Sequence, residues 1–266
     1  MNMESPEKAA AEEPGAARRP TLANTYIGAY VQMTRQPVYS LLFLVPLLIV
    51  YEAYAYFLNF NKPYQIRNGA DILVKTFFHF FGVDNLFSMM MAMLLAILVV
   101  VGISFRRMRQ PLIFSYFPLM LLESLAYAFL LGPVTQRLTG FVRHPFLGPD
   151  VPAQDMSLKV LVSLGAGVYE ELVFRVFLIS ALLYIFEKVA GFTPSNAVLT
   201  SILLSSLIFS SFHYLGAYRW QFTLESFLYR AIAGLVLSGL YIARGLGITA
   251  WTHSLYDIYV LIEAGP

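Results

Sequence analysis

The sequence predicts an all-α fold, a polytopic transmembrane helix bundle of seven to eight spans, from two observations. Of its 266 residues, 58% are hydrophobic and only 13% are charged, a balance typical of membrane proteins rather than soluble domains. The apolar residues also gather in runs close to the ~20 residues that a helix needs to cross a bilayer. A net charge of +2 without a basic, aromatic-rich run argues against nucleic-acid binding. Because the chain has no cysteine, disulfides and thiolate chemistry are excluded.

The N-terminal part is predicted to hold a tail and three spans. Residues 1–36 are expected to be a disordered or interfacial tail, because their start is rich in Ala, Glu and Pro and has no apolar periodicity. Residues 37–266 then form a single membrane domain. The spans expected here are 38–60, 86–105 and 112–131. The mixed stretch 61–84 suits an interfacial or re-entrant helix and becomes the eighth span if it crosses.

The C-terminal part follows a proline-punctuated loop predicted over residues 132–157. Four spans are expected after it: 158–186, 197–214, 227–243 and 246–262. Acidic residues at the expected membrane depth of the first and third spans, Glu52 and Glu123, are interpreted as structural acceptors of hydrogen bonds from other helices.

The stretch GAGVYEELVFRVF, residues 165–177, places three charges inside an apolar run. On an α-helix each residue advances about 100°, so Glu171 and Arg175, four apart, share a face and can pair. Glu170 then remains as the unpaired carboxylate, a candidate general base. In the alternative interpretation all three side chains only link neighbouring helices.

Two later motifs carry histidines. In FSSFHY, Phe209 lies four residues before His213, so that its ring can pack beneath the imidazole. In THSLYD, Asp257 lies four residues after His253 and can accept a ring N–H, which would set the tautomer.

A carboxylate with two imidazoles suits hydrolysis. Glu170 would take a proton from water, His213 would orient that water or share the base role, and His253 would stabilise the developing oxyanion. The same three side chains could instead hold a catalytic zinc, although the HExxH motif of zinc proteases is absent.

The motifs EELVFR, FSSFH and HSLYD, in this order, resemble those of the CPBP family, the CAAX prenyl protease-like intramembrane glutamic proteases, also called the Abi family, which includes bacteriocin-processing members. The resemblance covers residues 158–262, the predicted catalytic core. It implies that Glu170 and His213 activate water, that Glu171 and Arg175 support the site, and that His253 with Asp257 forms the oxyanion side. Some members have Asn in place of Asp257. An ionised Asp cannot donate a hydrogen bond, so Asp257 is expected to orient His253 or to stay protonated.

The expected function is therefore an intramembrane endopeptidase of the CAAX or sorting and maturation type, with no required cofactor or metal. Its partners would be the lipid bilayer and a membrane protein or peptide substrate, and its location the bacterial inner membrane. A catalytically silent scaffold or immunity-type binding protein is the main alternative. A transporter is disfavoured because the ionisable residues cluster in one half of the chain without a repeat in the other.

Overall fold

A computed structural model describes residues 26–60, 66–83, 85–108, 110–140, 156–215 and 222–264. Within these ranges the chain is all-α and contains no strand, as the sequence predicts. Most of the predicted tail lies outside the described residues, and its last part contains helix α1, Tyr26–Thr34.

The N-terminal helices after α1 are α2 (Pro37–Asn59), α3 (Gly69–Phe80), α4 (Leu86–Arg107) and α5 (Tyr116–Thr139). Local chemistry explains several of their ends. Pro37 occupies the first turn of α2, where its missing N–H costs nothing. The Asn68 side chain caps α3 by accepting the N–H of Ala70. Helix α5 continues through Pro133 and ends at Gly140, whose φ is +70°, so the loop predicted from residue 132 begins later.

The C-terminal helices begin with a long, composite one. It consists of α6 (Met156–Gly165), the π-helical segment η2 (Ala166–Leu178), α7 (Ile179–Tyr184) and a second π-helical segment, η3 (Ile185–Val189). The sequence predicts a helix over 158–186, but not the wider π-helical turn that occupies its charged centre. Helices α8 (Pro194–Phe212), α9 (Leu224–Arg244) and α10 (Leu246–Ala264) follow.

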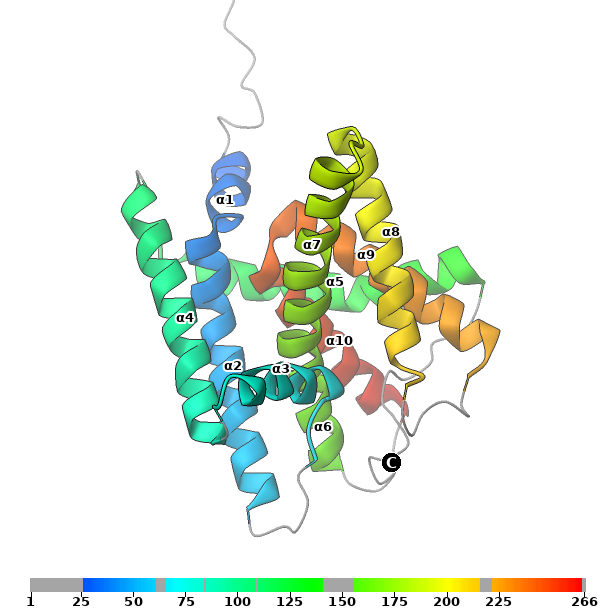
Figure 1. Cartoon of the computed structure of the whole chain (residues 1–266), viewed down its shortest axis with the longest axis horizontal. Coiled ribbons are helices and arrows are strands. Elements are labelled where there is room, and N and C mark those ends of the chain that lie inside the picture. The colour runs from blue at the N-terminus through cyan, green and yellow to red at the C-terminus, as the bar shows by residue number, and fades with distance from the viewer. Residues whose placement is uncertain are drawn as a thin grey trace, which may run out of the picture.

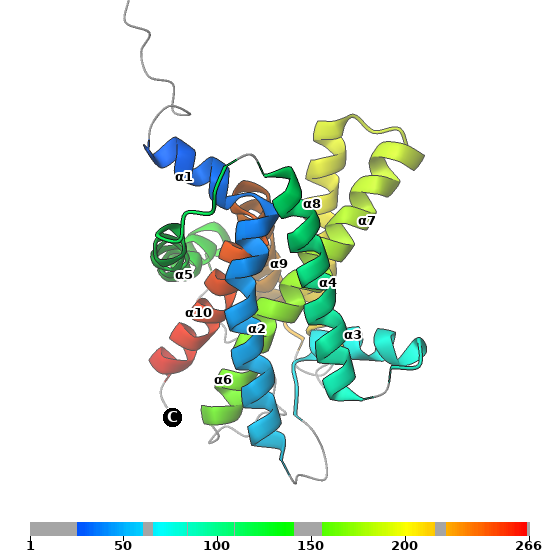
Figure 2. The same cartoon turned by 90° about the vertical axis from the view of Figure 1, so that its left-hand side faces the viewer.

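Among the residues that the structure describes, five helices are long and apolar enough to cross a membrane, so the predicted count of seven to eight spans is not confirmed. They are α2, residues 88–107 of α4, α5, α8 and α9. Neither the composite helix nor α10 is among these five. The composite helix is divided by its π-helical segments, and α10 contains polar residues such as His253 and Asp257, which lower its hydropathy. Figures 1 and 2 show that α5 runs across the direction of α2 and α4, and that α3 lies crosswise on the other side of the bundle.

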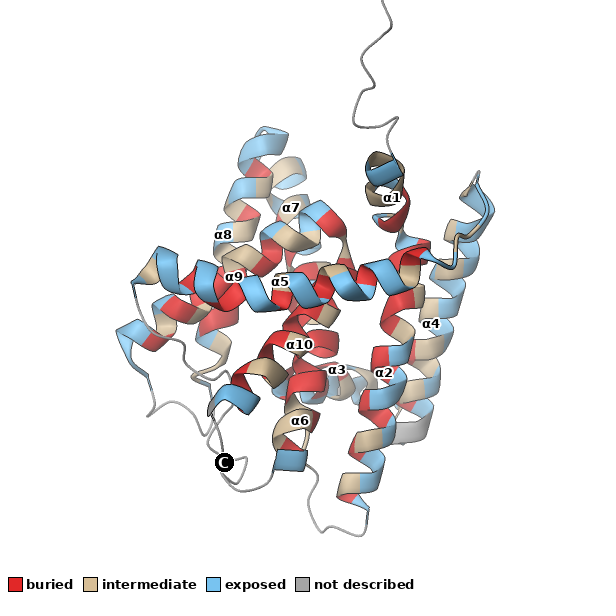
Figure 3. Cartoon of the chain, turned by 180° about the vertical axis from the view of Figure 1, so that it is seen from behind, coloured by how far each residue is buried: buried red, intermediate tan, exposed pale blue. Residues whose placement is uncertain are grey.

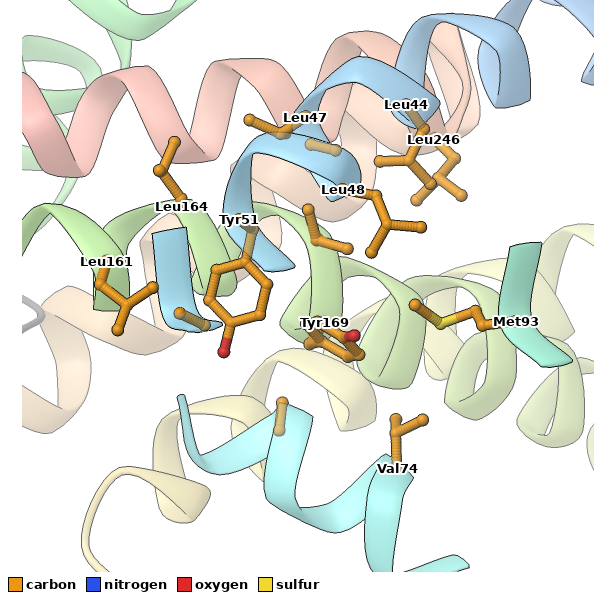
Figure 4. Packing of buried hydrophobic residues seen from close by; sticks show 14 of the residues in the cluster. Leu44, Leu47, Leu48, Tyr51, Val74, Met93, Leu161, Leu164, Tyr169 and Leu246 are labelled. Carbon is orange, nitrogen blue, oxygen red and sulfur yellow. The ribbon is translucent and has the colours of Figure 1, made fainter. Parts of the chain in front are cut away.

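Helix α10 forms the centre of the molecule. It packs against α2, α5, α6 and η2, and it is coloured mostly as buried in Figure 3, whereas α4 exposes most of its surface. A neighbouring cluster joins α2, α3, α4 and η2. Figure 4 shows Tyr51 and Tyr169 side by side there, with ring centroids 5.4 Å apart, and Val74 and Met93 beside them. The segment η2, which carries the predicted base Glu170, thus packs against α10 and against the cluster formed with α2, α3 and α4.

Close contact between η2 and α10 depends on Gly167. A Cβ atom at this position would lie 2.0 Å from Ser254 Oγ and 2.3 Å from the backbone oxygen of Ala250. We expect Gly167→Ala to destabilise the protein by about 1–3 kcal/mol, since the two helices would have to separate. Gly239→Ala is the matched control, because a Cβ there meets nothing within 4 Å. Thermal unfolding in detergent measures both, and equal midpoints for the two variants would contradict the prediction.

Candidate active site

The two adjacent acidic residues of η2 have different partners. Glu170 faces α3 and the end of α8, whereas Glu171 faces α10. Both side chains are buried, with Glu171 fully inaccessible and Glu170 7% exposed. Two neighbouring carboxylates therefore have separate surroundings, which is a common arrangement where two acids have different tasks.

One carboxylate oxygen of Glu170 has a hydrogen-bond partner and the other has none among the described residues. Its Oε1 accepts a hydrogen bond of 2.8 Å from Asn68 Nδ2. Its Oε2 is buried, has no hydrogen-bond partner among the described residues, and lies 3.9 Å from His213 Nε2. This distance is too long for a direct hydrogen bond, but a small molecule between the two atoms could form a hydrogen bond with each of them.

His213 ends helix α8 in a set orientation. Its Nδ1 lies 2.9 Å from the carbonyl oxygen of Phe209, and its ring packs edge-on against the Phe209 ring with centroids 4.8 Å apart, which confirms the predicted packing. A carbonyl oxygen only accepts, so Nδ1 must carry the proton. In the neutral ring Nε2 then presents a lone pair toward Glu170.

His253 is bound by Glu171 rather than by the predicted residue. Its Nδ1 lies 2.6 Å from Glu171 Oε1, while its Nε2 lies 3.7 Å from Asp257 Oδ2. The prediction that Asp257 accepts a ring N–H is wrong at this distance. Glu171, which lies on η2, contacts the His253 ring from a neighbouring helix. The spacing of residues along α10 could not reveal this contact.

The predicted pair of Glu171 and Arg175 is present. Arg175 Nη1 lies 3.0 Å from Glu171 Oε1, and the guanidinium stacks over the Phe209 ring at 4.5 Å from its centroid. Both charged side chains are fully buried. Arg175 and His253 thus contact the same oxygen of Glu171, Oε1, and Phe209 packs against both Arg175 and His213.

A buried charge cluster beside the site was missed by the sequence interpretation. It consists of two acids and two bases from α2, α3 and the segment between them: Glu52, Arg67, Asp71 and Lys75. The N–O distances within it are 2.7–3.1 Å, and Tyr169 of η2 donates to Glu52. Burial disfavours the charged guanidinium, but Asp71 and Glu52 hold the pKa of Arg67 above its usual value. The expected structural role of Glu52 as an acceptor is confirmed.

Glu123 also accepts hydrogen bonds from other elements, as predicted. Arg244 at the end of α9 binds it through Nε at 2.6 Å and Nη2 at 2.8 Å, and the Tyr30 hydroxyl donates to it at 2.6 Å. This cluster connects α1, α5 and α9 and is separate, within the described residues, from the groups around Glu170.

The donor groups that could hold a metal ion were compared with the predicted zinc ligands. In the parts of the chain that the structure describes, no group of three or more His, Cys, Asp or Glu side chains is placed to hold a metal ion. Glu170, His213 and His253, the trio that could bind zinc on sequence grounds, thus do not form such a group there.

Fold and site together define an integral membrane protein of apolar helices with an acid–histidine site buried between η2, α8 and α10. Residues 152–259 match the family model described as type II CAAX prenyl endopeptidase Rce1-like. This part of the chain is similar to that protease family, in agreement with the resemblance of the three motifs, and it contains all six predicted site residues. No curated protein and no solved structure gives a significant match.

Proposed function

We propose that this protein is an intramembrane endopeptidase that hydrolyses a peptide bond of a membrane-associated protein or peptide, with a water molecule activated by Glu170 and His213. The observation that carries the proposal is the pairing of the open Glu170 Oε2 with His213 Nε2 at 3.9 Å. A water oxygen about 2.8 Å from each atom fits this separation. The match of residues 152–259 to a protease family supports the same reaction class.

The chemical steps follow from these positions. Glu170 Oε2 takes a proton from the water while its oxygen attacks the carbonyl carbon of the scissile bond. The carbonyl oxygen becomes an oxyanion, and a protonated His253, which can donate from both nitrogens, stabilises it through Nε2–H. Glu170 then returns the proton to the leaving nitrogen as the C–N bond breaks. Glu171 and Arg175 keep the His253 ring in place through the contact at Nδ1.

We propose that this reaction needs no metal. A carboxylate beside a neutral imidazole can activate water without one, so cleavage should persist after dialysis against a strong zinc chelator. Loss of cleavage that added zinc restores would support the alternative, a zinc metalloprotease at the same residues.

We further propose the bacterial inner membrane as the location. It is tested by membrane fractionation of expressing bacteria, in which the chain should sediment with inner-membrane markers.

The experiment that tests the function compares newly exposed peptide termini in membranes from cells that express the wild-type chain or Glu170→Gln at equal levels. Termini that are present with the wild type and absent with the variant would identify substrates, cleavage positions and the membrane side of cleavage. Identical sets of termini, with both chains folded, would favour a catalytically silent scaffold and would overturn the proposal.

Asp257→Asn should reduce activity less than loss of Glu170 does. Asp257 lies 3.7 Å from His253 Nε2, so it affects the oxyanion side without contacting the proposed water, and Asn has the same shape. We expect a decrease of about tenfold or less, far below the 10²–10⁴-fold typical of a general base. Initial rates on an identified substrate peptide measure this. A loss as large as that of Glu170→Gln would contradict the assigned role.

A further inference from the structure

We infer that Asn68, which lies outside the matched family segment, is a positioning residue that orients the carboxylate of Glu170 for catalysis. The inference rests on the proposed function, because it assigns Glu170 the role of base. Its direct basis is the 2.8 Å hydrogen bond from Asn68 Nδ2 to Glu170 Oε1, between residues 102 positions apart in the sequence.

Two hydrogen bonds set the orientation of the Asn68 amide. Its Oδ1 accepts the N–H of Ala70 at 2.8 Å and so caps helix α3. A backbone N–H can only donate, so the amide oxygen must face Ala70 and the NH₂ group must face Glu170. One amide therefore joins the start of α3 to the carboxylate, and leaves Oε2 of Glu170 directed at His213.

The backbone around Asn68 is held close to η2 by packing. A Cβ atom at Gly165, just before η2, would lie 2.8 Å from Asn68 Cβ and 2.7 Å from the Tyr51 ring. Asn68 itself is 3% exposed. Only glycine at position 165 allows this approach, so the start of α3 lies close against the backbone that leads into η2.

The buried charge cluster of Glu52, Arg67, Asp71 and Lys75 holds α3 in place beside η2. Arg67, which precedes Asn68, binds Glu52 of α2 and Asp71 of α3, and the Tyr51 hydroxyl donates to Asp71 at 2.6 Å. Tyr169, which precedes Glu170, donates to Glu52. The neighbours of both Asn68 and Glu170 are thus tied to Glu52, and the N-terminal part of the chain becomes a component of the site.

Variants of Asn68 that still cap α3 can separate its role in orienting Glu170 from its role in stabilising the helix. Ser and Asp cap helices as well as Asn does, but Ser is too short to reach Glu170, and an ionised Asp has no proton to donate. The two substitutions are tested in the purified full chain in vesicles of phosphatidylethanolamine and phosphatidylglycerol. The probe is a peptide that reproduces a Glu170-dependent cleavage site. Thr193→Ala, which removes the side-chain cap of α8, is the matched control for the loss of a cap.

We expect Asn68→Ser and Asn68→Asp to lower kcat about 10- to 100-fold, as small misplacements of reacting groups do, with KM within about twofold of the wild type because Asn68 contacts the base and not the substrate. Thr193→Ala should keep the wild-type kcat. Wild-type kcat in a folded Asn68→Ser or Asn68→Asp chain would overturn the inference and leave capping as the role of Asn68.

A second readout does not depend on proteolysis. The infrared difference between the wild type and Glu170→Gln isolates the bands of the Glu170 carboxyl group, and we expect these bands to shift in the Asn68→Ser background. Unchanged bands would overturn the inference on their own. If wild type and Glu170→Gln cleave equally, the proposed function fails, and the infrared result still decides whether Asn68 binds and orients Glu170.

Discussion

Glu170→Gln is expected to reduce peptide cleavage by about 10²–10⁴-fold, the contribution typical of a general base. Gln has the shape of Glu and can still accept the Asn68 hydrogen bond at its Oε1, so the fold should persist while proton abstraction is lost. His213→Ala should have a comparable effect, because it removes the second partner of the attacking water. Initial rates on an identified substrate peptide measure both.

The losses of activity in Glu170→Gln and His213→Ala should not be additive. If Glu170 and His213 act on one water molecule, the double variant should be about as inactive as either single one. Glu187→Gln is the control, since Glu187 forms an exposed pair with Lys188 away from the site and its change should leave the rate unaltered. Substantial turnover in folded Glu170→Gln, or multiplied losses in the double variant, would contradict the shared-water mechanism.

Arg175→Met is expected to destabilise the protein by about 3–5 kcal/mol, the cost typical of removing one partner of a buried ion pair. Glu171 and Arg175 are both fully buried, and without the guanidinium at 3.0 Å the carboxylate is left, among the described residues, with the contact to His253. The Phe209 ring also loses the group stacked on it. Chemical or thermal unfolding in detergent measures the change.

The double variant Glu171→Gln with Arg175→Met tests the cause. It removes both charges, so it should recover much of the lost stability, but not the activity, because Glu171 holds the His253 ring. Lys188→Met breaks a pair whose side chains are 62% and 37% exposed and should change stability by less than about 1 kcal/mol. A single Arg175→Met variant as stable as Lys188→Met would contradict this account.

The all-α fold class followed from the sequence because long apolar runs indicate helices of membrane-spanning length. The predicted first span differs from α2 by a single residue at each end. The π-helical turn of η2 was not predictable in the same way, since π- and α-helical segments have the same residue preferences to first order and differ in hydrogen-bond pattern. Pro133 misled the prediction of α5 because a proline within a helix is tolerated where neighbouring helices hold its flanks.

At the candidate site, contacts within one helix were predictable and contacts between distant elements were not. The spacing of four residues correctly indicated the pairs Glu171 with Arg175 and Phe209 with His213. The same rule failed for His253, because Glu171, 82 positions away, binds the ring more closely than Asp257 does. Asn68 was not singled out by the sequence, because nothing in its local pattern indicates the contact with Glu170. Such contacts depend on how helices pack, which no local pattern records.

The most direct test of the central claim is cleavage by the purified chain in vesicles after removal of metal ions, with wild type and Glu170→Gln measured side by side on one substrate peptide. The account predicts that the wild type cleaves at an unchanged rate in the presence of chelator, whereas Glu170→Gln does not cleave. Equal cleavage by both chains, or wild-type cleavage that stops with chelator and returns with zinc, would contradict activation of water by Glu170 and His213 alone.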